Sequence, residues 1–275
     1  YNIMSSHVCK HQEIIPQAIR ETISMRYHVV TRAINREFWG IDSELEHSLY
    51  VGSYGRGTAV NTSDLDILVE LPQNRYMQYD VVKGNGQSRL LQAVRLAILN
   101  IYPRSDVRAD GQVVIISFSD GMKFEILPAF KNLNWIGQWD GTYIYPDTNM
   151  GGNWLPTNPK AEQEAMYVKN KQSNGLLYDT CKHIRSVRDS NYKSYHLSGI
   201  VIDSFVFSTI GNWKWVSDGE TSTSAWGEYE NHLLKSLENH LQRGIYHLYA
   251  PGSNQVLRWR DSTECLWKVL NYMVN

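Results

Sequence analysis

A glycine-rich segment directly ahead of a short alternating run constrains this chain more than any other feature. Residues Tyr50–Thr58 read Tyr-Val-Gly-Ser-Tyr-Gly-Arg-Gly-Thr, and the run Asp64–Glu70 begins a few residues later. The alternation in Asp64–Glu70 predicts a strand with two different faces, and it puts Asp64 and Asp66 on the same face. Small residues in the first segment allow backbone N–H groups and the Ser53 hydroxyl to approach a phosphate closely.

A phosphate and two carboxylates repel each other, so a site that holds both requires a divalent cation between them. A third carboxylate, Glu125, interrupts an otherwise apolar run and could complete a cation site from a neighbouring strand. We therefore predict that Asp64, Asp66 and Glu125 share one or two divalent cations beside a phosphate-binding turn at Gly52 and Ser53. The alternative is a plain turn and an edge strand with solvated acids.

The spacing of these groups resembles the hG[GS]…Dh[DE]h…h[DE]h signature of the polymerase-β-like nucleotidyltransferases. Gly52-Ser53 matches its first part, Asp64-x-Asp66 its second and Glu125 its third. More narrowly, four segments look like those of the bacterial cGAS/DncV-like nucleotidyltransferases, or CD-NTases: Gly84–Ser88, Asp110–Val114, Phe124–Phe130 and Trp154–Pro159. This resemblance extends from about Val51 to Phe207.

The resemblance implies an α+β fold, with a polymerase-β-like mixed-sheet core, a helical C-terminal lobe and the active site in the cleft between them. Residues 1–150 would form the core with a long N-terminal bracing helix, and residues 151–275 the lobe that closes the nucleotide cleft. Enzymes of this type make cyclic di- or trinucleotide second messengers from nucleoside triphosphates in bacterial antiphage (CBASS) signalling. Two alternatives stay open, transfer of a single nucleotide to a protein, tRNA or small molecule, and a catalytically silent nucleotide sensor.

The same resemblance assigns roles to the acids. In such enzymes two Mg²⁺ (or Mn²⁺) ions assist the attack of a ribose hydroxyl on the α-phosphate of a triphosphate. Asp64 and Asp66 would contact both ions, and Glu125 the ion that faces the nucleophile. Arg56 and Thr58 would either support the glycine turn or touch the phosphate.

Further nucleotide-binding residues are expected in the helical half. Lys182 and Arg185 lie one turn apart on a predicted helix and are candidates for the cation that holds the triphosphate. Here the chain departs from its relatives, because the triphosphate-binding lysine aligns with Arg185. Ser198 resembles a serine that helps to hold the donor triphosphate, and Tyr195 could stack on a base. Helix capping and packing explain Ser198 and Tyr195 nearly as well.

Composition limits the classes of protein that remain. The chain has 275 residues, of which 42% are hydrophobic, enough for a large globular core. A net charge of −1 does not favour a grip on long nucleic acid. Three scattered cysteines without a CxxC pair indicate no zinc-dependent DNA platform of the kind in animal cyclic GMP–AMP synthase. We expect a cytoplasmic monomer with no membrane association and no signal peptide. It would be either constitutively active or switched by a regulatory protein or a small molecule, and its product would act on an effector receptor.

Periodicity predicts the elements. A long helix is expected over residues 14–38, and a second helix, capped by Ser88, ends before Pro103. Residues 131–159 are rich in Trp, Gly, Pro and Asn, and we expect them to be irregular. The remaining expectations are strands at 48–51, 112–118 and 122–127, and helices at 161–171, 176–189, 198–210, 229–243 and 262–274.

Overall fold

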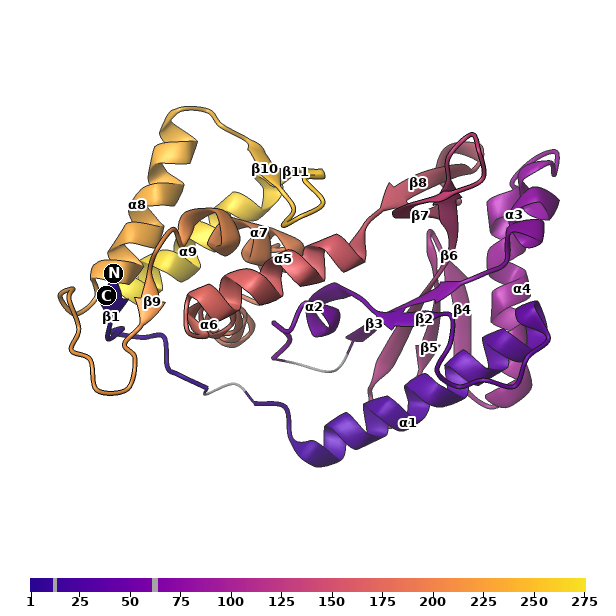
Figure 1. Ribbon diagram of the computed structural model, residues 1–275, viewed down its shortest axis with the longest axis horizontal. Helices are drawn as coiled ribbons and strands as arrows, with labels where there is room; N and C mark the ends of the chain where they lie inside the picture. Colours follow the sequence, from indigo (N-terminus) through magenta and orange to yellow (C-terminus); the bar gives the residue numbers. More distant parts are fainter. Residues whose placement is uncertain (12–13, 61–63) are drawn as a thin grey trace. The chain divides into compact units, whose positions relative to one another are not determined.

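The computed structural model describes residues 1–11, 14–60 and 64–275. The chain forms two compact units, and each is built from more than one segment. The sheet unit consists of Ile15–Gly55 and Asn61–Pro159, and the helical unit of Tyr1–Ile14, Arg56–Val60 and Lys160–Asn275. Both units are visible in Figure 1, which colours the chain from its N-terminus to its C-terminus. The predicted domains 1–150 and 151–275 stay a prediction.

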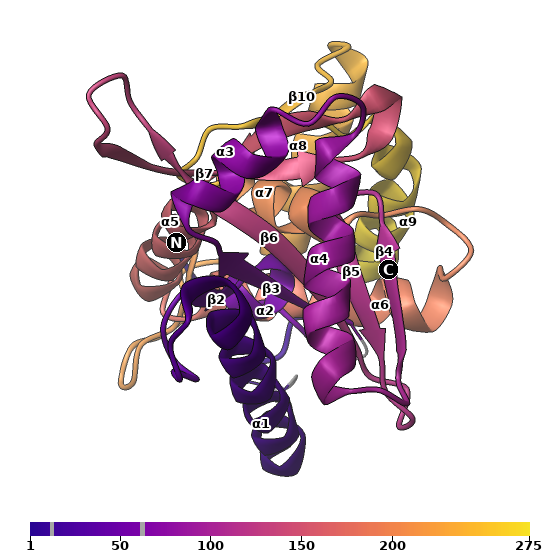
Figure 2. The same ribbon diagram turned by 90° about the vertical axis from the view of Figure 1, so that its right-hand side faces the viewer.

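A mixed sheet forms the centre of the sheet unit (Figure 2). Its central pair is parallel, and the other neighbours on the main path are antiparallel. The strand order along this path is β2 (Ser48–Tyr50), β3 (Asp64–Glu70), β6 (Lys123–Leu133), β5 (Val113–Ser117) and β4 (Asp106–Asp110). This arrangement confirms the predicted α+β class and the predicted strands.

Two long helices, α1 (Gln17–Ile34) and α4 (Gly86–Ile101), pack on one face of this sheet (Figure 2). A π-helical turn at Asn35–Trp39 extends α1, which confirms the predicted long helix. The side chains buried with them include Leu65, Ile67 and Val69, so the alternate residues of β3 face the other way, as predicted. A shorter helix, α3 (Gln73–Asp80), precedes α4.

The cap of α4 differs from the prediction. Asn85 is the N-cap, and its side chain accepts a hydrogen bond from the Ser88 N–H at 2.9 Å. Ser88 therefore lies inside the first turn and is the residue that is capped. Asparagine and serine are about equally good N-caps, so composition alone does not choose between neighbouring candidates.

The prediction of irregular structure for residues 131–159 was wrong. β6 continues to Leu133, and β7 (Trp139–Asp147) pairs with β6 and with β8 (Asn153–Thr157). Most of the glycines and asparagines belong to the connecting turns, although Asn132, Gly141 and Asn153 lie within the strands. Pro156 sits on β8, an edge strand where a missing N–H is tolerated. Pairing with distant strands, which composition does not report, decides the structure here.

The helical unit confirms the five predicted helices, with small shifts at their ends. Its helices are α5 (Pro159–Gln172), α6 (Leu176–Asn191), α7 (Gly199–Thr209), α8 (Glu228–Gln242) and α9 (Thr263–Val274). Two small strand pairs join them, β1 (Asn2–Ile3) with β9 (Lys214–Trp215) and β10 (His247–Tyr249) with β11 (Val256–Arg258). Among the described residues, no helix combines the length and the apolar character needed to cross a membrane.

Candidate active site

The glycine turn is fixed directly to the strand that carries the acids. After β2, the Val51 N–H donates to the Asp66 carbonyl at 2.9 Å, and Gly52–Gly55 form the one-turn helix α2. Gly52 has a φ of +60°, which glycine adopts without strain, and a Cβ at this position would overlap the Asp66 carboxylate. The backbone of the turn therefore lies against Asp66, and only glycine leaves room for that carboxylate.

Two of the three predicted acids meet across the parallel strand pair. Asp66 on β3 lies in register with Glu125 on β6, and a hydrogen bond links their side chains. Phe124 and Ile126 are buried in the core shared with α1 and α4, so Glu125 is on the opposite face, where Asp66 also points. Asp64 is exposed at the start of β3, next to residues 61–63, which lie outside the described part of the chain.

Negative charge is concentrated around Glu125, because Asp66 and Asp64 lie close to it. Burial of Glu125, the charges of Asp66 and Asp64, and the hydrogen bond with Asp66 together raise the pKa of Glu125 to about 7, against a smaller opposing effect of Lys123. Neighbouring carboxylates cannot all ionise without a compensating cation, so Glu125 retains its proton at a pH where a glutamate is normally charged. The charges of Asp66 and Asp64 therefore oppose the ionisation of Glu125.

This donor set fits a hard divalent cation. The groups are carboxylate oxygens, which Mg²⁺ and Mn²⁺ prefer over nitrogen or sulfur, and their repulsion is what a bound cation would relieve. In the described ranges 1–11, 14–60 and 64–275, no three His, Cys, Asp or Glu side chains form a ready-made cage. The structure thus brings Asp66 and Glu125 into contact, while Asp64 acts on Glu125 through its charge.

Three tyrosines that the sequence analysis did not single out hold the glycine turn in place. Tyr54 on α2 packs edge-on against Tyr50 at 5.0 Å between ring centroids, and Tyr50 stacks on Tyr27 of α1 at 4.1 Å. The Ser48 hydroxyl donates to the Tyr27 hydroxyl at 2.9 Å, which fixes the first strand of the site to the same helix. The turn is therefore braced by aromatic packing as well as by its bond to β3.

In the helical unit, Lys182 and Arg185 both lie on α6 but differ in their surroundings. Arg185 is only 3% exposed, and its guanidinium donates to both Asp203 carboxylate oxygens, at 2.6 and 3.0 Å. Lys182 is half-buried. The pairing with Asp203 argues against a triphosphate-binding role for Arg185 and leaves Lys182 as the better candidate on this helix.

The two softer candidates lie close to each other in the chain. Ser198 occupies the N-cap position of α7 without a side-chain capping bond, and its N–H donates to the Ser262 hydroxyl at 3.3 Å. Tyr195 is 39% exposed, and the Lys268 ammonium lies 4.8 Å from the centre of its ring. The Ser198 side chain is thus not used as a cap, and the Tyr195 ring already has a cation beside it.

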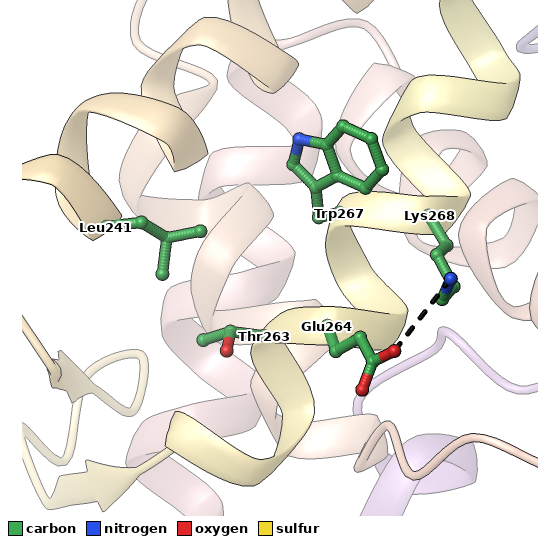
Figure 3. A pocket seen from close by; sticks show the side chains of 5 residues that line it. All are labelled: Leu241, Thr263, Glu264, Trp267 and Lys268. Carbon is green, nitrogen blue, oxygen red and sulfur yellow. Dashed lines mark ion pairs between the residues drawn. The ribbon is translucent and has the colours of Figure 1, made fainter.

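Lys268 also lines a hollow on the surface of the helical unit (Figure 3). This hollow encloses about 470 Å³, and its walls come from α8 and α9. Its lining residues are Leu241, Thr263, Glu264, Trp267 and Lys268, none of which was predicted to bind nucleotide. Glu264 and Lys268 form an ion pair at 3.8 Å along one side of it.

A buried aspartate was missed by the sequence analysis. Asp203 is fully buried on α7 and accepts hydrogen bonds from Arg56 Nε at 2.7 Å and Thr58 Oγ1 at 2.9 Å, in addition to those from Arg185. These contacts support the interpretation that Arg56 and Thr58 hold the chain and do not touch phosphate. The signal was present in the sequence, because Asp203 is the single charged residue in Gly199–Thr209.

A comparison with protein-family models identifies the chain by sequence. Residues 10–170 match the family described as the Second Messenger Oligonucleotide or Dinucleotide Synthetase (SMODS) domain. The chain belongs to this family. SMODS proteins are nucleotidyltransferases of the CD-NTase type, so the family that the motifs predicted is confirmed, together with the enzyme class. A search of curated protein sequences finds no significant match.

Solved structures confirm the SMODS fold at low sequence identity. The CdnE cyclic dinucleotide synthase of Elizabethkingia meningoseptica, solved with GTP and Apcpp, is 12% identical with a TM-score of 0.64, covering 92% of this chain and 89% of that one. The CdnE c-UMP-AMP synthase of Rhodothermus marinus, with Apcpp and Upnpp, is 14% identical with a TM-score of 0.60, covering 94% and 96%. CdnC of E. coli MS115-1, in a complex with HORMA-deltaN, is 12% identical with a TM-score of 0.58, covering 94% and 84%.

Proposed function

We propose that this SMODS protein joins nucleoside triphosphates into a cyclic di- or trinucleotide, in a reaction that depends on Mg²⁺ or Mn²⁺. One observation carries the proposal: Gly52 lies against Asp66, and Asp66 lies against Glu125, so a phosphate-binding turn and a carboxylate pair occupy one place on the sheet. Nucleotidyl transfer requires this arrangement, because cations held by the acids would neutralise the phosphates held by the turn.

Each predicted site residue of the sheet unit has a role in the proposed reaction. The N–H groups of the turn and the Ser53 hydroxyl would bind the phosphates of the donor. Asp64, Asp66 and Glu125 would hold two cations through their oxygens, and Glu125 would lose its proton when a cation binds. When bound, such ions lower the pKa of an attacking ribose hydroxyl and neutralise the charge of the departing pyrophosphate.

Residues of the helical unit would complete nucleotide binding. Lys182 would contribute positive charge to the triphosphate as a point charge on a flexible side chain. Ser198 would donate its hydroxyl to the same phosphates, and the exposed face of Tyr195 would stack on a base. Arg185 is left out of this set because Asp203 already binds its guanidinium.

The biological setting is proposed from the relatives. GTP and analogues of ATP and UTP are bound in the two CdnE structures, which supports nucleoside triphosphates as substrates here. The complex of CdnC with HORMA-deltaN supports regulation by a protein partner, with the cyclic product acting on a separate effector in antiphage signalling. We further propose a cytoplasmic monomer, and the three free cysteines, Cys9, Cys181 and Cys265, suit a reducing compartment.

A product assay tests this function. The purified protein is incubated with each radiolabelled triphosphate, alone and in pairs, with Mg²⁺ or Mn²⁺, and the products are then treated with phosphatase. Phosphatase-resistant label is expected from the wild type and from Glu70→Gln, which alters an acid at the other end of β3. Asp66→Asn and Glu125→Gln are expected to lose the product by several orders of magnitude.

The alternatives give different outcomes in the same assay. Label transferred to an added protein, tRNA or small molecule would indicate addition of a single nucleotide. Unchanged triphosphate with both metals, combined with measurable nucleotide binding, would indicate a sensor. Added DNA is expected to leave the rate unchanged, since the chain has a net charge of −1 and no basic platform is predicted.

A further inference from the structure

The residues that directly follow the glycine turn are bound by a buried charge cluster in the helical unit. Arg56 is 7% exposed and Thr58 is fully buried, and both donate to the same oxygen of Asp203, at 2.7 and 2.9 Å. Arg185 neutralises this aspartate from α6, and Glu162 on α5 lies 3.9 Å from Arg56. Arg56 thus lies in a chain of four charges of alternating sign, and the other three come from helices of the helical unit.

The backbone of the Arg56–Thr58 stretch is also closely packed, at Gly57. Gly57 has a φ of +79°, and a Cβ there would lie 2.7 Å from the Tyr178 ring on α6. A larger residue would therefore push Arg56 and Thr58 away from Asp203. Arg56–Val60 belong to the helical unit, whereas Gly52–Gly55, which precede them without a break in the chain, belong to the sheet unit.

We propose that Asp203 is a positioning residue for the nucleotide reaction, which acts through Arg56 and Thr58 on the phosphate-binding turn. This inference rests on the proposed function of the turn and adds a residue to it. The last amide of the turn, Gly55 N–H, is one peptide bond from Arg56 and donates to the Val51 carbonyl at 3.0 Å. Fixing Arg56 therefore fixes the end of the turn whose start lies against Asp66.

The chemistry of the cluster suits positioning. Hydrogen bonds to a charged, buried acceptor are among the stronger ones in proteins, because the charge is poorly screened there. Asp203 accepts hydrogen bonds from Arg56, Thr58 and Arg185, so these donors serve to hold the chain. Small displacements of substrate-binding groups reduce rates strongly, so a loosened turn should lower turnover before the fold is lost.

Thr58→Val tests the proposal with a matched control. The change removes the hydroxyl that binds Asp203 and keeps the shape of the side chain. Thr180→Val is the control, since Thr180 is equally buried in the helical unit and its hydroxyl binds Tyr229 at 2.8 Å and the Leu176 carbonyl at 2.7 Å. Arg56→Lys is a second variant that keeps the charge and loses the fixed geometry of the guanidinium.

Two readouts are compared in the four proteins. Amide hydrogen exchange at Gly52–Gly55 is expected to be about tenfold faster in Thr58→Val and Arg56→Lys than in the wild type, and kcat/KM for triphosphate about tenfold lower or more. Thr180→Val is expected to match the wild type in both measurements at comparable thermal stability. Equal exchange and equal kcat/KM in Thr58→Val and Thr180→Val would overturn the proposal. If the wild type makes no nucleotide product, the proposed function fails, and the exchange comparison still decides whether Asp203 positions the turn.

Discussion

The raised pKa of Glu125 predicts a measurable cost in stability above neutral pH. Glu125 ionises at about 7 in the folded chain against an ordinary value of 4.5, because it is partly buried beside Asp66 and Asp64. The folded state therefore binds one more proton than the unfolded state between these two values. The free energy of unfolding falls as the pH rises through this window and levels off above the folded pKa.

The magnitude follows from the two values. A change from 4.5 to about 7 corresponds to at most about 3.4 kcal/mol. Glu125 is only partly buried, and solvent screening reduces the expected loss to about 1–2 kcal/mol. For a chain of this size that loss lowers Tm by about 3–6 °C. Glu125→Gln mimics the protonated carboxyl and should remove the loss.

Thermal unfolding in EDTA at pH 5, 6, 7 and 8 measures the effect. Glu125→Gln is expected to be more stable than the wild type at pH 8, with the difference shrinking toward pH 5. Glu37→Gln changes an exposed acid of the same unit and should follow the wild type. If the difference between Glu125→Gln and the wild type has the same size at every pH, the coupling of the acids inferred from the structure is wrong.

The remaining predictions concern metal, the turn and the cations of α6. Mg²⁺ or Mn²⁺ at millimolar concentration should raise the Tm of the wild type at pH 8 and leave that of Asp66→Asn unchanged, as measured by the same unfolding assay. Gly52→Ala should lower activity by about 100-fold, while Gly40→Ala, with a similar positive φ and open space around it, should cost only about 1–2 kcal/mol of stability and no activity. Arg185→Met should destabilise by about 3–5 kcal/mol in chemical denaturation. Lys182→Ala should keep the stability of the wild type and raise KM for triphosphate; the reverse pattern would restore Arg185 as the triphosphate ligand.

Local sequence patterns predicted most of the helices and strands and the central acids of the site. The alternation in β3 put Asp66 on the face opposite the core, and one acid in an apolar run indicated Glu125. The register that sets these two residues side by side comes from parallel pairing of strands about 60 positions apart, which no local pattern encodes. The same dependence on distant partners explains why β7 and β8 were expected to be irregular.

The family pattern did not distinguish the roles of Lys182 and Arg185 on α6. Arg185 follows Cys181 and Leu177 at intervals of four, and both of these residues are fully buried. That spacing places Arg185 on the buried stripe of α6, whereas Lys182 lies one position off it. The stripe could have been recognised in the sequence. The identity of its partner, Asp203, could not, because nothing local connects α7 to Arg56 or Arg185.

The separation of Arg56 from Asp203 has a consequence for synthesis on the ribosome. The two residues are 147 positions apart, so at about 5–20 residues per second Arg56 emerges roughly 7–30 s before its carboxylate partner. During that interval the stretch after the glycine turn has no docking place, and the helical unit cannot close until its last segments are made. A nascent chain of this protein would therefore be open to proteases near Arg56 until the segment that carries Asp203 has emerged.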